Sequence, residues 1–450
     1  MPHDDNDSHL DSAPDSPGAD PTPEGPPPVA LLCPVGGVPD VSVAADEIAA
    51  AAETLARGSG PFAVDAERAS GFRYSNRAYL IQIRRSGAGT VLIDPVNHGG
   101  SPIDVLKPVA DVLSADEWIL HAADQDLPCL AEVGLRPPSL YDTELAGRLA
   151  GFDRVNLAAM VERLLGLGLA KGHGAADWSK RPLPEPWLNY AALDVEVLIE
   201  LRAAISEVLA AQDKTSWAAE EFEHLRCAES SPTRRDRWRR TAGLHKIRTR
   251  AGLAAARELW TARDRIARSR DIAPGRILPD SAIIAAAVAD PKTVDELLAL
   301  PVFGGQKQRR GAQIWLDALA AARTTDQPPE ISESLNGPPP PMRWAKRKPE
   351  AAAHLEAARS ALAELSARVS VPAENLLSPE LVRRLCWDWQ DTSDTAAAVD
   401  VFLRDGGARA WQRSLVVPVL APTLNHGVNS GDPAVGPPSR RAPPVPPPSR

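Results

Sequence analysis

Two carboxylates stand two positions apart at the end of an apolar segment, PFAVDAE at 61–67. Residues two apart on a β-strand point to the same face, so Asp65 and Glu67 project together. Like charges at the edge of an apolar strand are stable when water reaches them or when a cation lies between them. An acidic pair on a surface turn is the alternative, which a single Asp-x-Glu does not exclude.

Two further acidic segments follow. In HAADQDL at 121–127 a predicted strand runs into a helix, where Asp124 suits an N-terminal cap and Asp126 is left as a candidate metal ligand. In NYAALD at 189–194 a helix is predicted, and Tyr190 and Asp194 share one face because they are four apart. Taken alone, each feature is also ordinary in a structural helix.

Together the four acids suit phosphodiester hydrolysis by two divalent ions, in which one carboxylate bridges the ions and the others hold each of them. Oxygen ligands favour Mg²⁺ or Mn²⁺ over zinc. A tyrosine hydroxyl one turn from a metal-bound aspartate is placed to orient the attacking water. His121, at the end of a strand, is interpreted as a packed or hydrogen-bonded residue instead of a base.

The elements that must position these residues suggest an α/β domain. Strands are predicted at 61–67, 78–83, 90–94, 117–122 and near 139–142, and helices at 41–56, 103–114, from about 124, 143–150, 156–166 and 184–211. A meander followed by alternating strands and helices indicates a mixed sheet flanked by helices. No strand is predicted from 217 to 322, where helices are expected at 253–269, 280–289, 293–298 and 311–322. A second helical block is expected at 348–420.

Length and composition indicate several folded units joined by proline-rich segments. The chain has 450 residues, with 44 prolines and only 5% aromatic residues. The expected order is a disordered acidic tail (1–30), an α/β domain that carries the acidic segments (31–215), a helical domain (216–323), a proline-rich linker (324–344), a second helical domain (345–424) and a disordered proline-rich tail (425–450).

Charge and cysteine content exclude some classes of protein. A net charge of −9 argues against a protein that coats nucleic acid non-specifically, but it is compatible with a nuclease that uses metal ions and a local basic patch. The four cysteines form no Cys-x-x-Cys pair, which argues against structural zinc and a disulfide framework. No leader or membrane-spanning segment is recognised, so a cytoplasmic protein without a membrane partner is expected.

The three acidic segments resemble the motifs of the DEDDy 3′→5′ exonucleases and are most similar to those of the ribonuclease D family. SNRAYLIQI at 75–83, YDTELA at 141–146 and DWSKRPL at 177–183 extend the resemblance, which covers roughly 40–215. It implies a ribonuclease-H-like fold with Asp65, Glu67, Asp126 and Asp194 as ligands of two divalent ions, Mg²⁺ or Mn²⁺. Tyr190 would position the nucleophilic water.

The helical blocks are also similar to that family. Residues 234–322 resemble an HRDC (helicase and RNase D C-terminal) domain and 345–420 a second, divergent one, which implies that both help to bind RNA. The basic run at 234–240 supports this, with Trp238 as a stacking residue beside Arg234, Arg235, Arg237, Arg239 and Arg240. A solvated basic hinge is the alternative. Lys171 and Trp178 precede the third motif and are candidates for contact with a phosphate or a base, although Trp178 also suits simple packing.

The leading hypothesis is a 3′→5′ exoribonuclease of ribonuclease D type that trims structured RNA with a free 3′ end, such as tRNA precursors, and releases 5′-mononucleotides. A DNA 3′→5′ exonuclease is one alternative, because no residue can be assigned to reading the 2′-hydroxyl. A catalytically inactive nucleic-acid-binding scaffold is the other, and the presence of all four acids and Tyr190 speaks against it. No protein partner is identified by the sequence.

Overall fold

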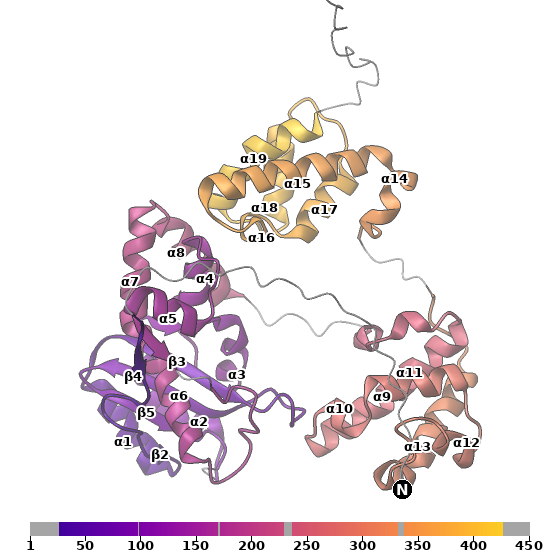
Figure 1. Ribbon diagram of the computed structural model, residues 1–450, viewed down its shortest axis with the longest axis horizontal. Coiled ribbons are helices and arrows are strands. Elements are labelled where there is room, and N and C mark those ends of the chain that lie inside the picture. The colour runs from indigo at the N-terminus through magenta and orange to yellow at the C-terminus, as the bar shows by residue number, and fades with distance from the viewer. Residues whose placement is uncertain (1–26, 98, 170–171, 229–235, 332–336, 426–450) are drawn as a thin grey trace, which may run out of the picture.

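A computed structural model describes residues 27–97, 99–169, 172–228, 236–331 and 337–425, and Figure 1 shows its arrangement. Most of the expected N-terminal tail and nearly all of the C-terminal one lie outside these ranges. The end of the expected N-terminal tail forms strand β1 (Val29–Leu31), which pairs in parallel with β8 (Leu167–Leu169). Neither of these two short strands was predicted.

The sheet that carries the acids has six strands in the order β2-β5-β4-β3-β6-β7. Its strands are β2 (Val41–Ser42), β3 (Ser59–Arg68), β4 (Ala78–Ser86), β5 (Gly89–Ile93), β6 (Trp118–Leu120) and β7 (Leu140–Asp142). β3, β4 and β5 form the predicted antiparallel meander, whereas β6 and β7 continue the sheet in parallel from β3. The prediction of a mixed sheet is confirmed, and β3 lies inside this sheet between β4 and β6.

Helices cover both faces of this sheet. α1 (Ala45–Ala56) and α2 (Pro102–Leu113) share a core with Val64, Ile81 and Ile83 on one face. α6 (Glu185–Glu196) lies on the other face, where Ala191 and Ala192 pack against Leu80. Because side chains alternate along a strand, Asp65 and Glu67 project towards α6 while Val64 and Ala66 enter the core on the opposite side.

The remaining helices of this part are α3 (Leu127–Glu132), α4 (Thr143–Leu149), α5 (Leu157–Leu165), α7 (Leu198–Ala211) and α8 (Thr215–Cys227). The prediction of a single helix at 184–211 is wrong, because the helical backbone is interrupted at Val197 between α6 and α7. The break lets α6 lie along the sheet while α7 packs against α4 and α5. The helix expected from 41 starts only at Ala45, after the residues of β2.

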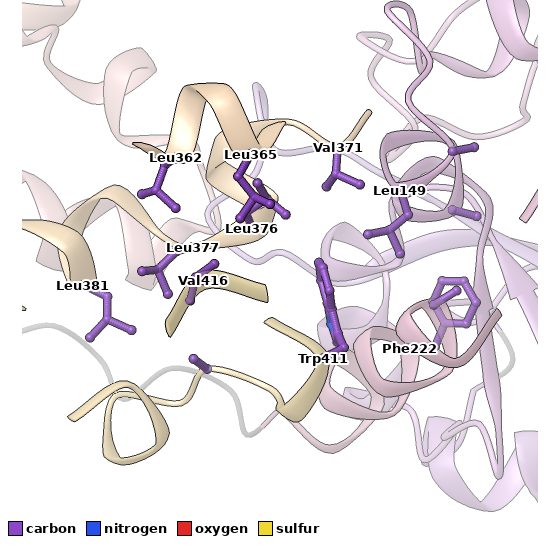
Figure 2. Close-up of a cluster of buried hydrophobic side chains, with 14 of the residues drawn as sticks. Leu149, Phe222, Leu362, Leu365, Val371, Leu376, Leu377, Leu381, Trp411 and Val416 are labelled. Atoms are coloured by element: carbon purple, nitrogen blue, oxygen red, sulfur yellow. The ribbon is translucent and has the colours of Figure 1, made fainter. Parts of the chain in front are cut away.

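The C-terminal helical domain shares one core with the exonuclease part. It consists of α14 (Trp344–Arg347), α15 (Pro349–Val369), α16 (Ala373–Leu376), α17 (Pro379–Asp388), α18 (Thr395–Asp405) and α19 (Ala410–Leu424). Figure 2 shows Trp411 between the leucines of this domain and the side chains of Leu149 and Phe222. Trp411 also stacks on Trp217 of α8, with 5.0 Å between ring centroids and 13° between planes. α8 starts at the expected domain boundary of 215/216 and packs against α4, α7 and α19.

The other helical domain has a core of its own. It contains α9 (Arg250–Arg270), α10 (Pro274–Ile277), α11 (Asp280–Ala289), α12 (Val294–Leu298) and α13 (Gln306–Arg323), preceded by the short turns η2 (Arg237–Arg240) and η3 (Leu244–Lys246). It contacts the loop between β3 and β4, which reaches towards it in Figure 1. The Tyr74 hydroxyl donates to Asp264 at 3.0 Å, and the backbone N–H of Ser75 donates to Asp271 at 2.8 Å.

Two further observations concern the whole chain. All four cysteines are free, in agreement with the sequence-based expectation. Across the described ranges, none of the helices combines the length and the apolar character needed to span a membrane.

Candidate active site

Three of the four predicted acids meet where β3 faces α6. Asp65, Glu67 and Asp194 each offer a carboxylate oxygen, and these oxygens all lie within 4.8 Å of one another. Strand alternation places the first two on one face, and α6 brings Asp194 over that face. α6 starts with Pro186 in its first turn, which suits a helix start because proline lacks the N–H that would be unpaired there.

Asp126 joins this group from a turn after β6. Its carboxyl group lies close enough to that of Asp65 for each group to affect the pKa of the other. The turn η1 (Ala123–Gln125) begins after Ala122, whose backbone is left-handed with a φ of 60°. The N-cap role expected for Asp124 is not observed, because neither η1 nor α3 has a side-chain cap.

Asp142 holds this turn and was not recognised as part of the site. One of its oxygens accepts from the backbone N–H of Ala122 at 3.1 Å and the other from Ala123 at 2.8 Å. The same carboxylate caps α4 by accepting from Glu144 and Leu145. Burial raises the pKa of Asp142 to about 6, against the opposing effect of these N–H donors. The available signal was an aspartate between a buried strand and a helix, which is typical of a cap.

The acids are in an environment that disfavours their charge. Burial is the largest influence on each of them, and it raises the pKa of Asp65 and places those of Glu67, Asp126 and Asp194 well above the ordinary range. Neighbouring carboxylates raise the pKa of the last three further. Glu67 and Asp126 are buried, and Asp65 and Asp194 are half-buried. Acids that repel one another in such a site are stabilised by bound cations, which favour the ionised forms.

A buried amide supports the same conclusion. Gln82 of β4 pairs directly with Asp65 of β3, so the two side chains share a face of the sheet. The side chain of Gln82 is fully buried, and neither its Nε2 nor its Oε1 has a hydrogen-bond partner among the described residues. Buried polar groups are normally satisfied, so a missing polar partner is indicated beside Asp65. The oxygen ligands and the unsatisfied amide together fit hydrated divalent cations such as Mg²⁺.

Tyr190 is placed one turn before Asp194 on α6, and its hydroxyl interacts with the Asp194 carboxylate. Burial and the nearby acids raise its pKa far above the ordinary value, so the hydroxyl stays protonated. Gly172 lies against the ring: a Cβ built on it would be 1.6 Å from Cε2 of Tyr190. A pocket of about 170 Å³ beside this ring is lined by residues that include His173, Asn189 and Asp194.

The predicted RNA contacts are partly corrected. Trp178 is fully buried with its ring 5.3 Å from that of Trp187, and Trp238 is only 4% exposed, so both tryptophans are core residues and not stacking platforms. The indole N–H of Trp238 donates to Asp236 at 2.9 Å. Arg239 covers the Trp238 ring, whereas Arg237 and Arg240 are exposed. Lys171, Arg234 and Arg235 lie outside the described residues.

His121 is a hydrogen-bonded residue, as expected. Its Nδ1 lies 2.9 Å from the Thr143 hydroxyl, which itself donates to the backbone oxygen of Leu120. The imidazole also makes a hydrogen bond with the backbone of Val155. Burial lowers its pKa to about 4.

The comparisons with known proteins agree with this geometry. Residues 41–210 match the family model of a 3′-5′ exonuclease, 252–319 that of the HRDC domain, and 337–424 that of a 3′ to 5′ exonuclease C-terminal domain. A ribonuclease D of Jannaschia sp. (strain CCS1) is 32% identical over 271 residues, which are 58% of this chain and 68% of the relative.

Solved structures extend the likeness along the chain. A protein from Bifidobacterium adolescentis is 35% identical with a TM-score of 0.78, covering 89% of this chain and 100% of the other. Ribonuclease D of Escherichia coli has the same fold at 24% identity, with a TM-score of 0.60 over 82% of this chain and 99% of that one. The chain thus belongs to the ribonuclease D family and is a 3′→5′ exoribonuclease.

Proposed function

We propose that Asp65, Glu67, Asp126 and Asp194 hold two divalent ions, Mg²⁺ or Mn²⁺, with Asp65 shared between them. The observation that carries this proposal is the double role of Asp65. It groups with Glu67 and Asp194 within 4.8 Å and also interacts with Asp126. A carboxylate common to two ligand groups is what hydrolysis by two metal ions requires.

When bound, the ions supply Lewis-acid activation of water and neutralise the charge that develops on the phosphate. The protein supplies position. Tyr190 stays protonated because its pKa is strongly raised, so its hydroxyl orients the attacking water by hydrogen bonding and does not remove a proton from it. The water attacks the 3′-terminal phosphodiester in line, and a 5′-mononucleotide leaves.

The substrate is RNA with a free 3′ end, and structured RNA such as tRNA precursors is the proposed natural class. The Escherichia coli structure carries the description of an exoribonuclease involved in structured RNA processing, which supports this choice. The HRDC domain would contribute RNA contacts outside the catalytic site, and the exposed Arg237 and Arg240 are candidates for them. The packing of α8 supports an exonuclease unit that extends to Cys227 instead of 215.

A gel assay tests the proposal. RNA and DNA oligomers of the same sequence, labelled at either end, are incubated with Mg²⁺, with Mn²⁺ or with EDTA, beside a tRNA precursor with a 3′ extension. A metal-dependent ladder from the 3′ end of RNA, lost in Asp65→Asn and Asp194→Asn, is expected. Faster digestion of DNA would contradict the substrate class, and activity in either variant would contradict the ligand assignment.

A further inference from the structure

Arg68 is a basic residue inside the acidic site. It is the last residue of β3 and directly follows Glu67, at a point where the pairing of β3 with β4 shifts register by one residue. Such irregularities change the direction of side chains at the end of a strand. The guanidinium of Arg68 reaches Asp126, with 3.5 Å between Nε and Oδ1, and Gln125, with 3.4 Å between NH2 and Oε1.

Arg68 acts electrostatically on most of the cluster. Its charge lowers the pKa of Asp65, Glu67 and Asp126, opposing the larger effect of burial on each. A cation in this position stabilises part of the negative charge of the acids when no metal is bound. In the metal-free protein Arg68 therefore supplies positive charge beside Asp126, as a metal ion bound there would.

The contacts of Arg68 are also suited to exchange. Both distances are at the long end for hydrogen bonds, and Gln125 is exposed. A guanidinium has five N–H donors, so most of them are unused by these two contacts. The Arg68 side chain is 24% exposed although that of Asp126 is only 7% exposed. The group thus stands between the buried acids and solvent, where an incoming RNA strand would arrive.

We propose that Arg68 is an exchangeable counter-cation: it pairs with Asp126 in the metal-free protein, is released when a divalent ion binds there, and then binds a phosphate of the RNA. This inference rests on the proposed metal site. Guanidinium groups bind phosphate in bidentate geometry, which makes the phosphate of the strand the matching partner for the released side chain. Arg68 is accordingly a positioning residue for the substrate and a competitor of the metal.

The test measures metal binding and RNA binding separately. Mn²⁺ affinity and stoichiometry are determined by electron paramagnetic resonance without RNA. RNA affinity is determined by fluorescence anisotropy in saturating Mn²⁺. The probe is a short RNA in which a methylene group replaces the bridging 3′ oxygen of the last phosphodiester, so that the strand is not cleaved. The variants are Arg68→Gln and Arg68→Lys, with Arg57→Gln as the matched control. Arg57 is the exposed residue that ends α1, before β3 begins, and it donates to the Thr54 hydroxyl.

The proposal predicts opposite changes in Arg68→Gln. Its Mn²⁺ affinity should rise about tenfold, because a positive charge beside Asp126 is removed. Its RNA affinity in saturating Mn²⁺ should fall about tenfold or more, because a charged hydrogen-bonding partner of phosphate is lost. Arg68→Lys keeps the charge, so its Mn²⁺ affinity should stay near that of the wild type and its RNA affinity should fall less. Arg57→Gln should change neither quantity.

Other outcomes are equally decisive. A merely structural role would weaken Mn²⁺ and RNA binding together in Arg68→Gln, and this result would overturn the proposal. Unchanged values in both variants would overturn it too. If the wild-type protein and Asp194→Asn bind Mn²⁺ equally, or neither binds it, the metal assignment itself fails. This outcome distinguishes the failure of the proposed function from that of the Arg68 exchange.

Discussion

Gly172 is predicted to be required for the position of Tyr190. A Cβ at Gly172 would lie 1.6 Å from Cε2, 2.2 Å from Cδ2 and 2.5 Å from Cζ of the Tyr190 ring. Since ordinary contact starts at about 3.4 Å, the Gly172→Ala variant must displace the ring or the loop by about 1.8 Å. Displacing a positioned catalytic group by about 1 Å costs roughly a hundredfold in rate, or about 2.7 kcal/mol.

Single-turnover cleavage of a short 5′-labelled RNA in saturating Mg²⁺ measures this effect. Gly172→Ala should reduce the rate by about a hundredfold with little change in thermal stability, because the glycine is exposed. Gly174→Ala is the matched control: its Cβ would lie 3.5 Å from the Tyr190 hydroxyl, which is an ordinary contact. The control should retain activity.

Two results would refute the reasoning. If Gly172→Ala cleaves at the wild-type rate, the loop yields instead of the ring. If Gly172→Ala lowers the rate of a Tyr190→Phe protein further, the alanine does not act through the tyrosine hydroxyl, because coupled changes are non-additive. The expected double variant is no slower than Tyr190→Phe alone.

Three other variants test the electrostatics and the packing. Gln82→Met removes a buried amide that has no hydrogen-bond partner among the described residues, so in EDTA it should raise the free energy of unfolding by about 1–3 kcal/mol and with it the melting temperature. It should also weaken Mn²⁺ binding, and a lower melting temperature in EDTA would contradict this. The pKa of His121 is about 4 in the folded protein, against an ordinary value of 6.5. Between these pH values only the unfolded chain binds the proton, so the free energy of unfolding decreases as the pH falls below 6.5. This loss is about 2 kcal/mol at pH 5. His121→Asn, which keeps an N–H donor, should lose that part of the pH dependence in urea unfolding, and an unchanged pH profile would argue against it. Glu221→Gln replaces a buried carboxylate with a neutral amide. That carboxylate accepts hydrogen bonds from Arg409 at 2.6 and 2.7 Å and from Trp411 at 2.8 Å. Glu221→Gln should lower the free energy of unfolding by about 2 kcal/mol. This loss is smaller than for a fully buried ion pair because Arg409 is partly exposed. The control Asp405→Asn changes an exposed ion pair and should be neutral in the same melting experiment.

The four acids proposed as metal ligands and the sheet were accessible from the sequence because local patterns determine them. Alternation fixes Asp65 and Glu67 on one strand face, and helical periodicity fixes Tyr190 and Asp194 on one helix face. The break at Val197 was missed because apolar periodicity continues through it, and the packing of α7 on α4 and α5 decides it. Trp238 was expected to stack on RNA and Trp178 was left open between an RNA contact and packing, because residue type does not distinguish an aromatic group that stacks on RNA from one that fills a core. Both side chains are buried.

The sequence alone determined which residue types are present, their spacing, and therefore the chemistry of oxygen ligands for divalent metals. Only the tertiary structure decided what surrounds them. Within the described part of the chain, it placed Asp65 beside the other acids, Arg68 on Asp126, Gln82 beside Asp65 with no hydrogen-bond partner, and Gly172 against the Tyr190 ring. The physical reason is that these contacts join residues far apart in the chain, and burial and mutual repulsion depend on distances that spacing along a sequence does not fix.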